Sequence, residues 1–343
     1  MGRKAALLRS SFILSPSSFV VIPVTRCPGG RGNLFKVKLF VFILSGLLWS
    51  SSPVAFASDA PVQYRNVRPS DAKWKRAKKS YGKSADLLLA KINRVDLKRL
   101  KRQSSLVVPA RPVDILDCSP FPQTLTEVAN WPKLVLVSRR VQAFGAYERG
   151  RLVRWGPTST GVKEQPTPEH LYFTSWKSRR KTSSLDRSWI MPWYVNLHTS
   201  MGVAFHQYSL PGRPFSHGCI RLLKDDAIWM YHWTDEWVPN EDRITARVFG
   251  TPVIVFGDFE YDKTPPWRRL PKDPRATDVT LEDLEPPLEN YRTVIEERAR
   301  AREGLKGPQG PKGPKGGVTS IDACTRDVTP PLGPLGPLGP LGP

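Results

Sequence analysis

The stretch Phe215-Ser216-His217-Gly218-Cys219-Ile220-Arg221-Leu222 places a cysteine directly after His-Gly. A second histidine, His206, lies upstream in the same segment. The thiolate form of cysteine is the nucleophile, and a neighbouring imidazole can make it available near neutral pH. These residues therefore predict acyl transfer through a thioester on Cys219.

The chain has 343 residues, enough for one or two domains, and it is strongly basic. Lys and Arg number 52 against 31 Asp and Glu, a formal net charge of +21. This charge suits an anionic partner such as a wall polymer, a membrane surface or nucleic acid. No nucleic-acid recognition motif is present, so a nucleic-acid partner is not expected.

The N-terminus predicts an export signal over residues 1–57. Two lysines precede an apolar run at residues 39–49, and the small-x-small site Ala55-Phe56-Ala57 follows. The run is shorter than the roughly 20 residues that span a bilayer. We expect cleavage after Ala57 and export to the periplasm or cell-wall compartment. An uncleaved N-terminal anchor is the alternative, and residues 1–33 are either a long basic region or sequence upstream of the true start.

The cysteines indicate at least one free thiol in an exported chain. Cys27 would be lost with the signal, which leaves Cys118, Cys219 and Cys324. Either Cys118 and Cys324 form a disulfide and Cys219 stays free, or all three are thiols. No paired cysteine spacing supports a zinc site, and neither a metal nor an organic cofactor is expected.

Residues 58–130 form a basic, partly helical lead-in or linker in this interpretation. Apolar spacing over residues 84–102 predicts one amphipathic helix, or two short ones broken near Asp96. The basic side chains of this region either form a solvated face or attach the protein to an anionic wall polymer or membrane surface.

Residues 131–258 have a different pattern, with many short strand signals and a single helix signal at Lys224 to Tyr231. This predicts a mainly β (α+β) fold, a compact β-sandwich or open barrel with one or two short helices. The predicted strands are 134–137, 141–147, 152–155, 171–173, 193–197, 202–206 and 251–256.

The C-terminal part is rich in proline and charge. Residues 259–303 are expected to be an extension carrying an exposed helix from Glu289 to Glu303. Residues 304–343 form a low-complexity Gly/Pro tail with collagen-like triplets, too few for a triple helix, and are expected to be disordered or polyproline-II.

The segment from about Lys133 to Phe256 resembles the catalytic domain of the L,D-transpeptidases, the YkuD-type family. The nucleophile motif matches at every position from Ser216 to Leu222. Further pieces match in the same order along the chain: Val141 to Gly150 (opening hairpin), Thr158-Ser159-Thr160-Gly161, Thr167-Pro168, Phe205-His206, Asp226-Ala227 and Gly250-Thr251-Pro252-Val253.

The resemblance implies a substrate and a reaction. Enzymes of this family act on peptidoglycan stem peptides. The cysteine would attack the carbonyl between the L-centre of diaminopimelate and the terminal D-Ala, D-Ala would leave, and an amine of a second stem would take the acyl group to give a 3-3 cross-link. Water as acceptor would make the protein an L,D-carboxypeptidase. A non-catalytic wall-binding protein that retains the fold is the remaining alternative.

The resemblance also implies roles for individual residues. Cys219 is the nucleophile, His206 the general base, and His217 orders the site. Gly218 permits a sharp turn, so that N–H groups around it could form an oxyanion hole. A backbone carbonyl could orient the imidazole, since Gln207 follows it. The candidate substrate-binding residues are Arg221, whose guanidinium matches a carboxylate, Ser216 and Tyr208; an ion pair for Arg221 and a cleft-wall role for Tyr208 are the alternatives.

Overall fold

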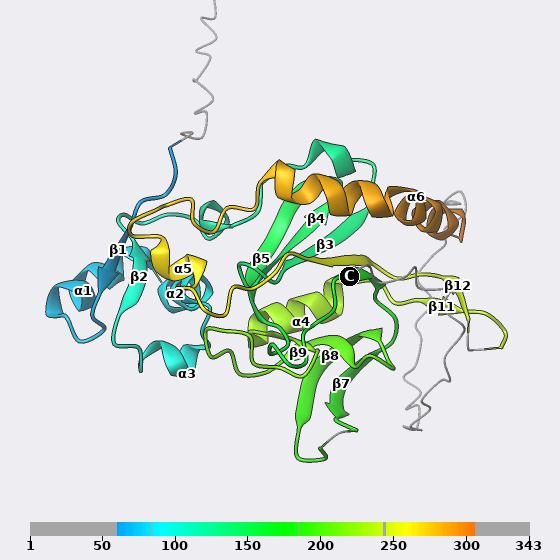
Figure 1. The fold of residues 1–343 in the computed structure, drawn as a ribbon, viewed down its shortest axis with the longest axis horizontal. Helices are drawn as coiled ribbons and strands as arrows, with labels where there is room; N and C mark the ends of the chain where they lie inside the picture. The colour runs from blue at the N-terminus through cyan, green and yellow to red at the C-terminus, as the bar shows by residue number, and fades with distance from the viewer. Residues whose placement is uncertain (1–59, 83, 185, 243–244, 306–343) are drawn as a thin grey trace, which may run out of the picture. The chain divides into compact units, whose positions relative to one another are not determined.

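The computed structural model describes residues 60–82, 84–184, 186–242 and 245–305 (Figure 1). The predicted signal region, Cys27, Cys324 and the Gly/Pro tail from residue 306 onward lie outside the described residues. Within the described part of the chain, no helix has both the length and the apolar character needed to cross a membrane.

One curled sheet of nine strands forms the body of the structure, and it confirms the predicted mainly β fold. Its spatial order is β6-β13-β3-β4-β5-β10-β9-β8-β7. The pairs β3–β13 and β9–β10 are parallel, and the other neighbours are antiparallel. The strands are β3 (Lys133–Ser138), β4 (Ala143–Glu148), β5 (Arg151–Ser159), β6 (His170–Phe173), β7 (Lys177–Thr182), β8 (Ile190–His198), β9 (Val203–Gln207), β10 (Ile220–Leu222) and β13 (Pro252–Phe256).

Strand β3 shows why this sheet has a core on both faces. Leu134 and Leu136 pack into one hydrophobic cluster, and Val135 and Val137 pack into another. Successive side chains of a strand point to opposite faces, so a strand covered on both sides must be apolar at every position. β13, its parallel partner, alternates between the same two clusters.

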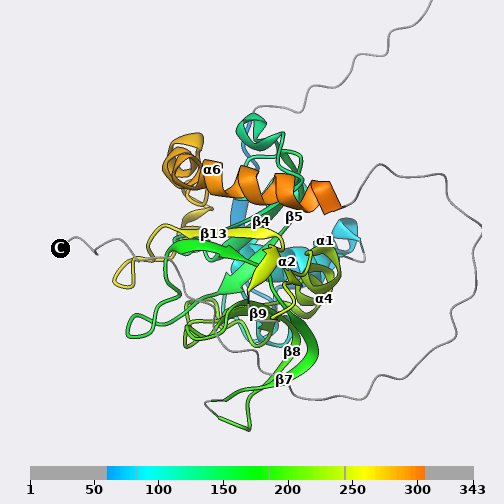
Figure 2. The ribbon, with the colours of Figure 1, turned by 90° about the vertical axis from the view of Figure 1, so that its right-hand side faces the viewer.

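Two helices cover these two faces (Figures 1 and 2). α4 (Lys224–Trp233) packs against β8 and β9, and α6 (Leu281–Leu305) covers the other face. The helix predicted at Glu289 to Glu303 begins earlier, at Leu281, and only part of it is exposed. Leu284, Leu288 and Ile295 of α6 are buried in the core, because their spacing of about one and two further turns gives the helix an apolar stripe.

The smaller elements lie mainly before the sheet in sequence. Of the two alternatives for residues 84–102, the structure has two short helices with a break before Leu97. The Asp96 side chain caps the second helix and accepts a hydrogen bond from the Arg99 N–H, 2.9 Å away. Strand β1 pairs with β2 in a separate antiparallel sheet and was not predicted. These elements are β1 (Tyr64–Val67), α1 (Ala72–Ala77), η1 (Lys78–Tyr81), α2 (Ala85–Asn93), α3 (Leu97–Leu100), β2 (Leu106–Pro109), η2 (Leu116–Cys118), η3 (Thr126–Val128), β11 (Val238–Pro239), β12 (Ala246–Val248) and α5 (Pro266–Arg269).

A buried ion cluster, here called the internal clamp, joins α2 to the sheet and to α4. The Lys91 ammonium and the Arg154 guanidinium both donate to Oδ1 of Asp226, at 2.9 and 2.8 Å. Lys91 also donates to the Trp155 carbonyl. Asp226 lies in the first turn of α4, just after the nucleophile motif. The clamp therefore fixes the start of α4 relative to the segment that precedes the sheet.

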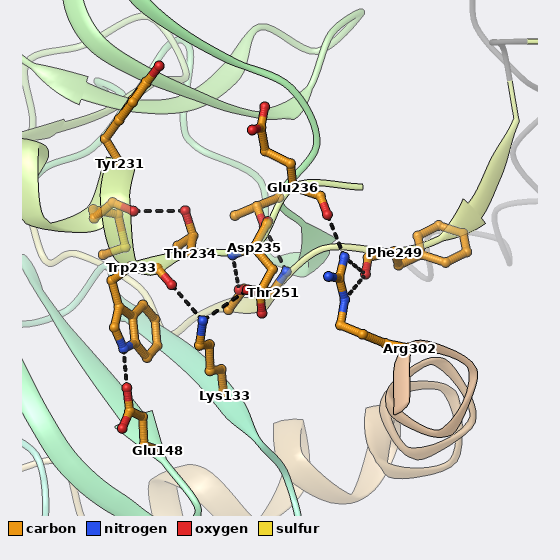
Figure 3. A network of polar contacts seen from close by, with 12 residues as sticks. Lys133, Glu148, Tyr231, Trp233, Thr234, Asp235, Glu236, Phe249, Thr251 and Arg302 are labelled. Carbon is orange, nitrogen blue, oxygen red and sulfur yellow. Dashed lines mark hydrogen bonds and ion pairs between the residues drawn. The ribbon is translucent and has the colours of Figure 1, made fainter. Parts of the chain in front are cut away.

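The far end of α4 is held by a second set of polar contacts (Figure 3). The Lys133 ammonium donates to the Trp233 carbonyl (2.7 Å) and to Asp235 (3.0 Å). The Arg302 guanidinium of α6 donates to the carbonyls of Glu236 and Phe249. The loop after α4 is thereby fixed to both β3 and α6.

Candidate active site

Six of the predicted site residues line one cavity of about 340 Å³. It lies beside the β7–β8 hairpin, at the ends of β9 and β10. Gly218, the seventh, is in the loop next to the nucleophile. The six residues are Cys219, His206, His217, Ser216, Tyr208 and Arg221.

Cys219 is positioned by the turn that precedes it. Gly218 has φ +107°, a backbone conformation that residues with a Cβ rarely adopt. The Thr167 hydroxyl donates to the Gly218 carbonyl at 2.8 Å, and the Ser216 hydroxyl donates to the Cys219 carbonyl. Ser216 therefore has an internal role in holding the turn.

The Thr-Ser-Thr-Gly turn at 158–161 supports this loop from behind. The Ser216 N–H donates to the Thr160 carbonyl at 3.0 Å, and the Gly161 N–H donates to the Thr167 hydroxyl, also at 3.0 Å. A Cβ on Gly161 would lie 2.0 Å from the Gln165 carbonyl oxygen, so only glycine fits there. Residues 158–161 and the segment 216–222 are both among the motifs that carry the family resemblance, and the structure places them in contact.

His206 is almost completely buried, with 4% of its surface exposed. It lies on β9, directly opposite Arg221 of the parallel strand β10. Its Nδ1 is 3.0 Å from the Gln207 carbonyl oxygen, which can only accept, so Nδ1 carries the proton and Nε2 has a free lone pair. Burial lowers the pKa of His206 to about 4, and the imidazole is therefore neutral at pH 7.

The Cys219 thiol rests in its neutral form. Its Sγ donates to the Gly202 carbonyl at 3.0 Å, and burial raises its pKa to about 11. Among the described residues no hydrogen bond joins Cys219 to His206. The cavity lining therefore includes a neutral thiol and a neutral imidazole. Catalytic hydrogen bonds are often long without substrate and tighten when it binds.

Aromatic side chains form much of the cavity wall. Trp189 packs on the exposed His217 ring with centroids 5.1 Å apart, which holds His217 at the rim. Trp176 and Tyr194 stack with ring centroids 5.0 Å apart and line the cavity. Trp193 does not line it and packs near Tyr231 instead.

Arg221 is held by aromatic contacts. Its guanidinium lies 4.7 Å from the centre of the Tyr208 ring and 5.6 Å from that of Phe215. Within the described ranges it forms no ion pair, so the alternative of a fold-stabilising salt bridge is not supported. Tyr208 thus acts as a wall that orients Arg221.

Several cavity residues were not predicted from the sequence. Lys181 of β7 lines the cavity, and the Gly202 carbonyl accepts the thiol hydrogen bond. Lys181 belongs to the basic run Lys177 to Lys181, whose composition does not tell which cation faces inward. Met191, which pairs with Lys181 across the two strands, also lines the cavity. This pairing would have been the better indication of which cation faces inward.

Cys118 is far less accessible than Cys219. It is buried in the η2 segment without a disulfide partner among the described residues, and burial raises its pKa to about 12. A disulfide with Cys324 and a free thiol both stay predictions for Cys118, because Cys324 lies outside the described residues. No group of three or more His, Cys, Asp or Glu side chains in the described ranges could hold a metal ion.

Comparison with known proteins assigns a family to one segment. Residues 132–255 match the sequence model of the L,D-transpeptidase catalytic domain, YkuD. This confirms the family resemblance for that segment of the chain. No curated protein sequence matches the chain at a significant level.

Solved structures that are similar to the chain include L,D-transpeptidases from Stackebrandtia nassauensis (23% identity, TM-score 0.31), Mycobacterium smegmatis (22%, 0.30) and Mycobacterium tuberculosis H37Rv (25%, 0.29). Each similarity covers 37% of this chain, and 57%, 59% and 58% of the other chain, respectively. The chain thus spans less than two thirds of these proteins.

Proposed function

We propose that this chain, whose residues 132–255 carry an L,D-transpeptidase catalytic domain, is a cysteine L,D-transpeptidase that acts on peptidoglycan stem peptides. The observation that supports this most strongly is the common cavity of Cys219 and His206, with the His206 Nδ1 tied to a carbonyl and Nε2 free to accept a proton.

In the proposed first half-reaction, His206 takes the thiol proton as the sulfur attacks the carbonyl between the diaminopimelate L-centre and D-Ala. The carbon–sulfur bond forms, the carbon–nitrogen bond breaks, and the imidazolium gives its proton to the departing D-Ala amine. Because the thiol and the imidazole are both neutral at rest, the thiolate forms only as the attack proceeds.

The intermediate of this step is an oxyanion, which needs hydrogen-bond donors. In this proposal the donors are the N–H groups of residues 218 and 219, at the turn where Gly218 has φ +107°. Such a donor contributes about 3–4 kcal/mol to lowering the barrier. Arg221 would bind a carboxylate of the stem peptide through its planar guanidinium.

In the second half-reaction, an amine of a second stem attacks the thioester, the carbon–sulfur bond breaks, and the sulfur recovers a proton by way of His206. The product is a 3-3 cross-link. With water as acceptor the product is a tripeptide. We further propose that the chain works outside the cytoplasm, as its substrate and the signal-like residues 1–57 suggest, with the basic N-terminal region contacting an anionic wall polymer or membrane surface.

The direct test is incubation of the purified protein with a disaccharide-tetrapeptide, with products identified by mass. A cross-linked dimer supports the transpeptidase, a tripeptide the carboxypeptidase, and unchanged substrate a wall-binding protein without catalysis. Cys219→Ala should abolish all product formation while the protein stays folded.

A carbapenem provides a second readout. The Cys219 thiolate should open its β-lactam ring and give an adduct of one carbapenem mass. The matched control is Cys118→Ala, which removes a buried thiol outside the cavity and should leave the adduct intact. Absence of an adduct on the wild-type protein would contradict a competent nucleophile.

A further inference from the structure

The charge of the active-site cavity is one-sided. Among the described residues that line it are two basic side chains, Lys181 and Arg221, and no aspartate or glutamate. The protein therefore brings two positive groups to a partly enclosed space without supplying an anion of its own. Cations removed from water are costly unless an opposite charge accompanies them.

The two cations come from different elements of the cavity wall. Arg221 belongs to β10 and is oriented by the Tyr208 ring. Lys181 belongs to β7, and its ammonium lies 5.6 Å from the centre of the Trp176 ring. Cation–π contacts of this kind orient a cation without neutralising it. Neither side chain forms an ion pair with any residue in the described part of the chain.

The strand pairing explains why Lys181 rather than its neighbour faces the cavity. Lys181 is opposite Met191, which lines the cavity, whereas Arg180 is opposite Pro192, which lines a different groove. Side chains of successive residues in a strand point to opposite faces. Arg180 carries the same charge one position away and does not line the cavity, so it is a matched control.

We propose that Lys181 is a second carboxylate-binding residue, which acts with Arg221 to select donor stems with free carboxylates over stems whose carboxyl groups are amidated. This inference rests on the proposed function and specifies its substrate class. An amidated stem offers a neutral group to a site with two unneutralised cations. It therefore loses a charge-assisted hydrogen bond that the carboxylate makes.

The test compares two synthetic disaccharide-tetrapeptides that differ only in the side-chain carboxyl of diaminopimelate, which is free in one and amidated in the other. Release of D-Ala gives kcat/KM for each donor. We expect the wild-type protein to prefer the free carboxylate by about tenfold or more. Lys181→Gln should reduce this preference to about threefold or less, and Lys181→Arg should restore most of it.

Arg180→Gln should keep the wild-type preference, because this side chain does not line the cavity. Thermal unfolding of each variant verifies that the fold is intact. Equal use of both donors by the wild type, or an unchanged preference in Lys181→Gln, would overturn the inference and leave the proposed function standing. No turnover of either donor, together with no carbapenem adduct, would overturn both.

Discussion

The internal clamp and the active-site cavity each hold one lysine and one arginine, but only the clamp has its own carboxylate. In the clamp, Lys91 and Arg154 converge on the buried Asp226. None of the described residues that line the cavity with Lys181 and Arg221 is acidic. A lysine and an arginine thus have a carboxylate partner where they hold the fold together, and none among the described residues where we propose that a ligand enters.

Removal of the clamp carboxylate should have the largest effect. Asp226→Asn leaves Lys91 and Arg154 buried or half-buried without a counter-charge, and should lower the free energy of unfolding by about 3–5 kcal/mol. Urea denaturation measures the change. Asp225→Asn, an exposed neighbour in the same turn, should cost less than about 1 kcal/mol. Equal losses in the two variants would mean that the clamp is not specific.

The next prediction concerns the pH dependence of folding stability. Burial of His206 lowers its pKa, so its protonation opposes folding. Its pKa is about 4 in the folded protein and 6.5 when unperturbed. Above pH 6.5 the residue is neutral in both states and stability is complete. As pH falls from 6.5 towards 4, the unfolded chain binds the proton first, so stability should decrease by about 3 kcal/mol.

Urea denaturation from pH 7.5 to 4 in the wild type and His206→Gln isolates this contribution. His170 and His198 also have lowered pKa values, but they are present in both proteins and cancel. The variant should lose less stability on acidification. Parallel curves for the two proteins would show that His206 is not the group responsible.

A carboxylate introduced into the cavity should give its two cations a counter-charge, as Asp226 does in the internal clamp. Ser184 is exposed and lines the cavity, so Ser184→Glu would supply a carboxylate near the two cations. We expect kcat/KM for the carboxylate donor to fall about tenfold and that for the amidated donor to change little. Ser188→Glu, in the same loop but outside the cavity lining, is the control. A similar fall in both variants would point to a long-range effect of charge.

A higher salt concentration should have the smallest effect. It should change the donor preference of the cavity and leave the stabilisation by the internal clamp unchanged. The Debye length falls from about 10 Å at 0.1 M to about 3 Å at 1 M salt, and buried pairs are screened much less than accessible ones. The preference for the carboxylate donor should decrease about threefold over this range. The stability difference between wild type and Asp226→Asn should stay constant. A salt-independent preference would argue against open cations.

The sequence allowed much of the sheet to be predicted, because burial on both faces leaves a clear pattern. The run Leu134 to Val137 is apolar at every position, as a doubly covered strand requires. β7 was missed because Lys177 to Thr182 contains no apolar residue, and it is a strand only through its pairing with β8. The helix was predicted only from Glu289 to Glu303 because charges dominate that range, whereas Leu284 and Leu288, which begin the apolar stripe of α6, lie before it.

Only part of the candidate site could be predicted, and that part came from the motif and the family resemblance instead of a burial pattern. Cys219, His206 and Arg221 were named from the motif and the family resemblance, and the structure places them around one cavity. Lys181 could not be named, because the direction of its side chain depends on the register with Met191. The strand pairs keep the same register on both sides of Trp193, whose φ of +56° is a backbone irregularity that no local pattern in the sequence reveals.

The hydrogen bond between His206 and the Gln207 carbonyl has a consequence for the tolerance of this position to substitution. The atom that fixes the imidazole tautomer belongs to the main chain, and every amino acid supplies it. The side chain at position 207 therefore need not be glutamine for His206 to keep the tautomer that the proposed mechanism requires. Saturation mutagenesis should show that activity tolerates substitution at position 207 and does not tolerate it at position 206.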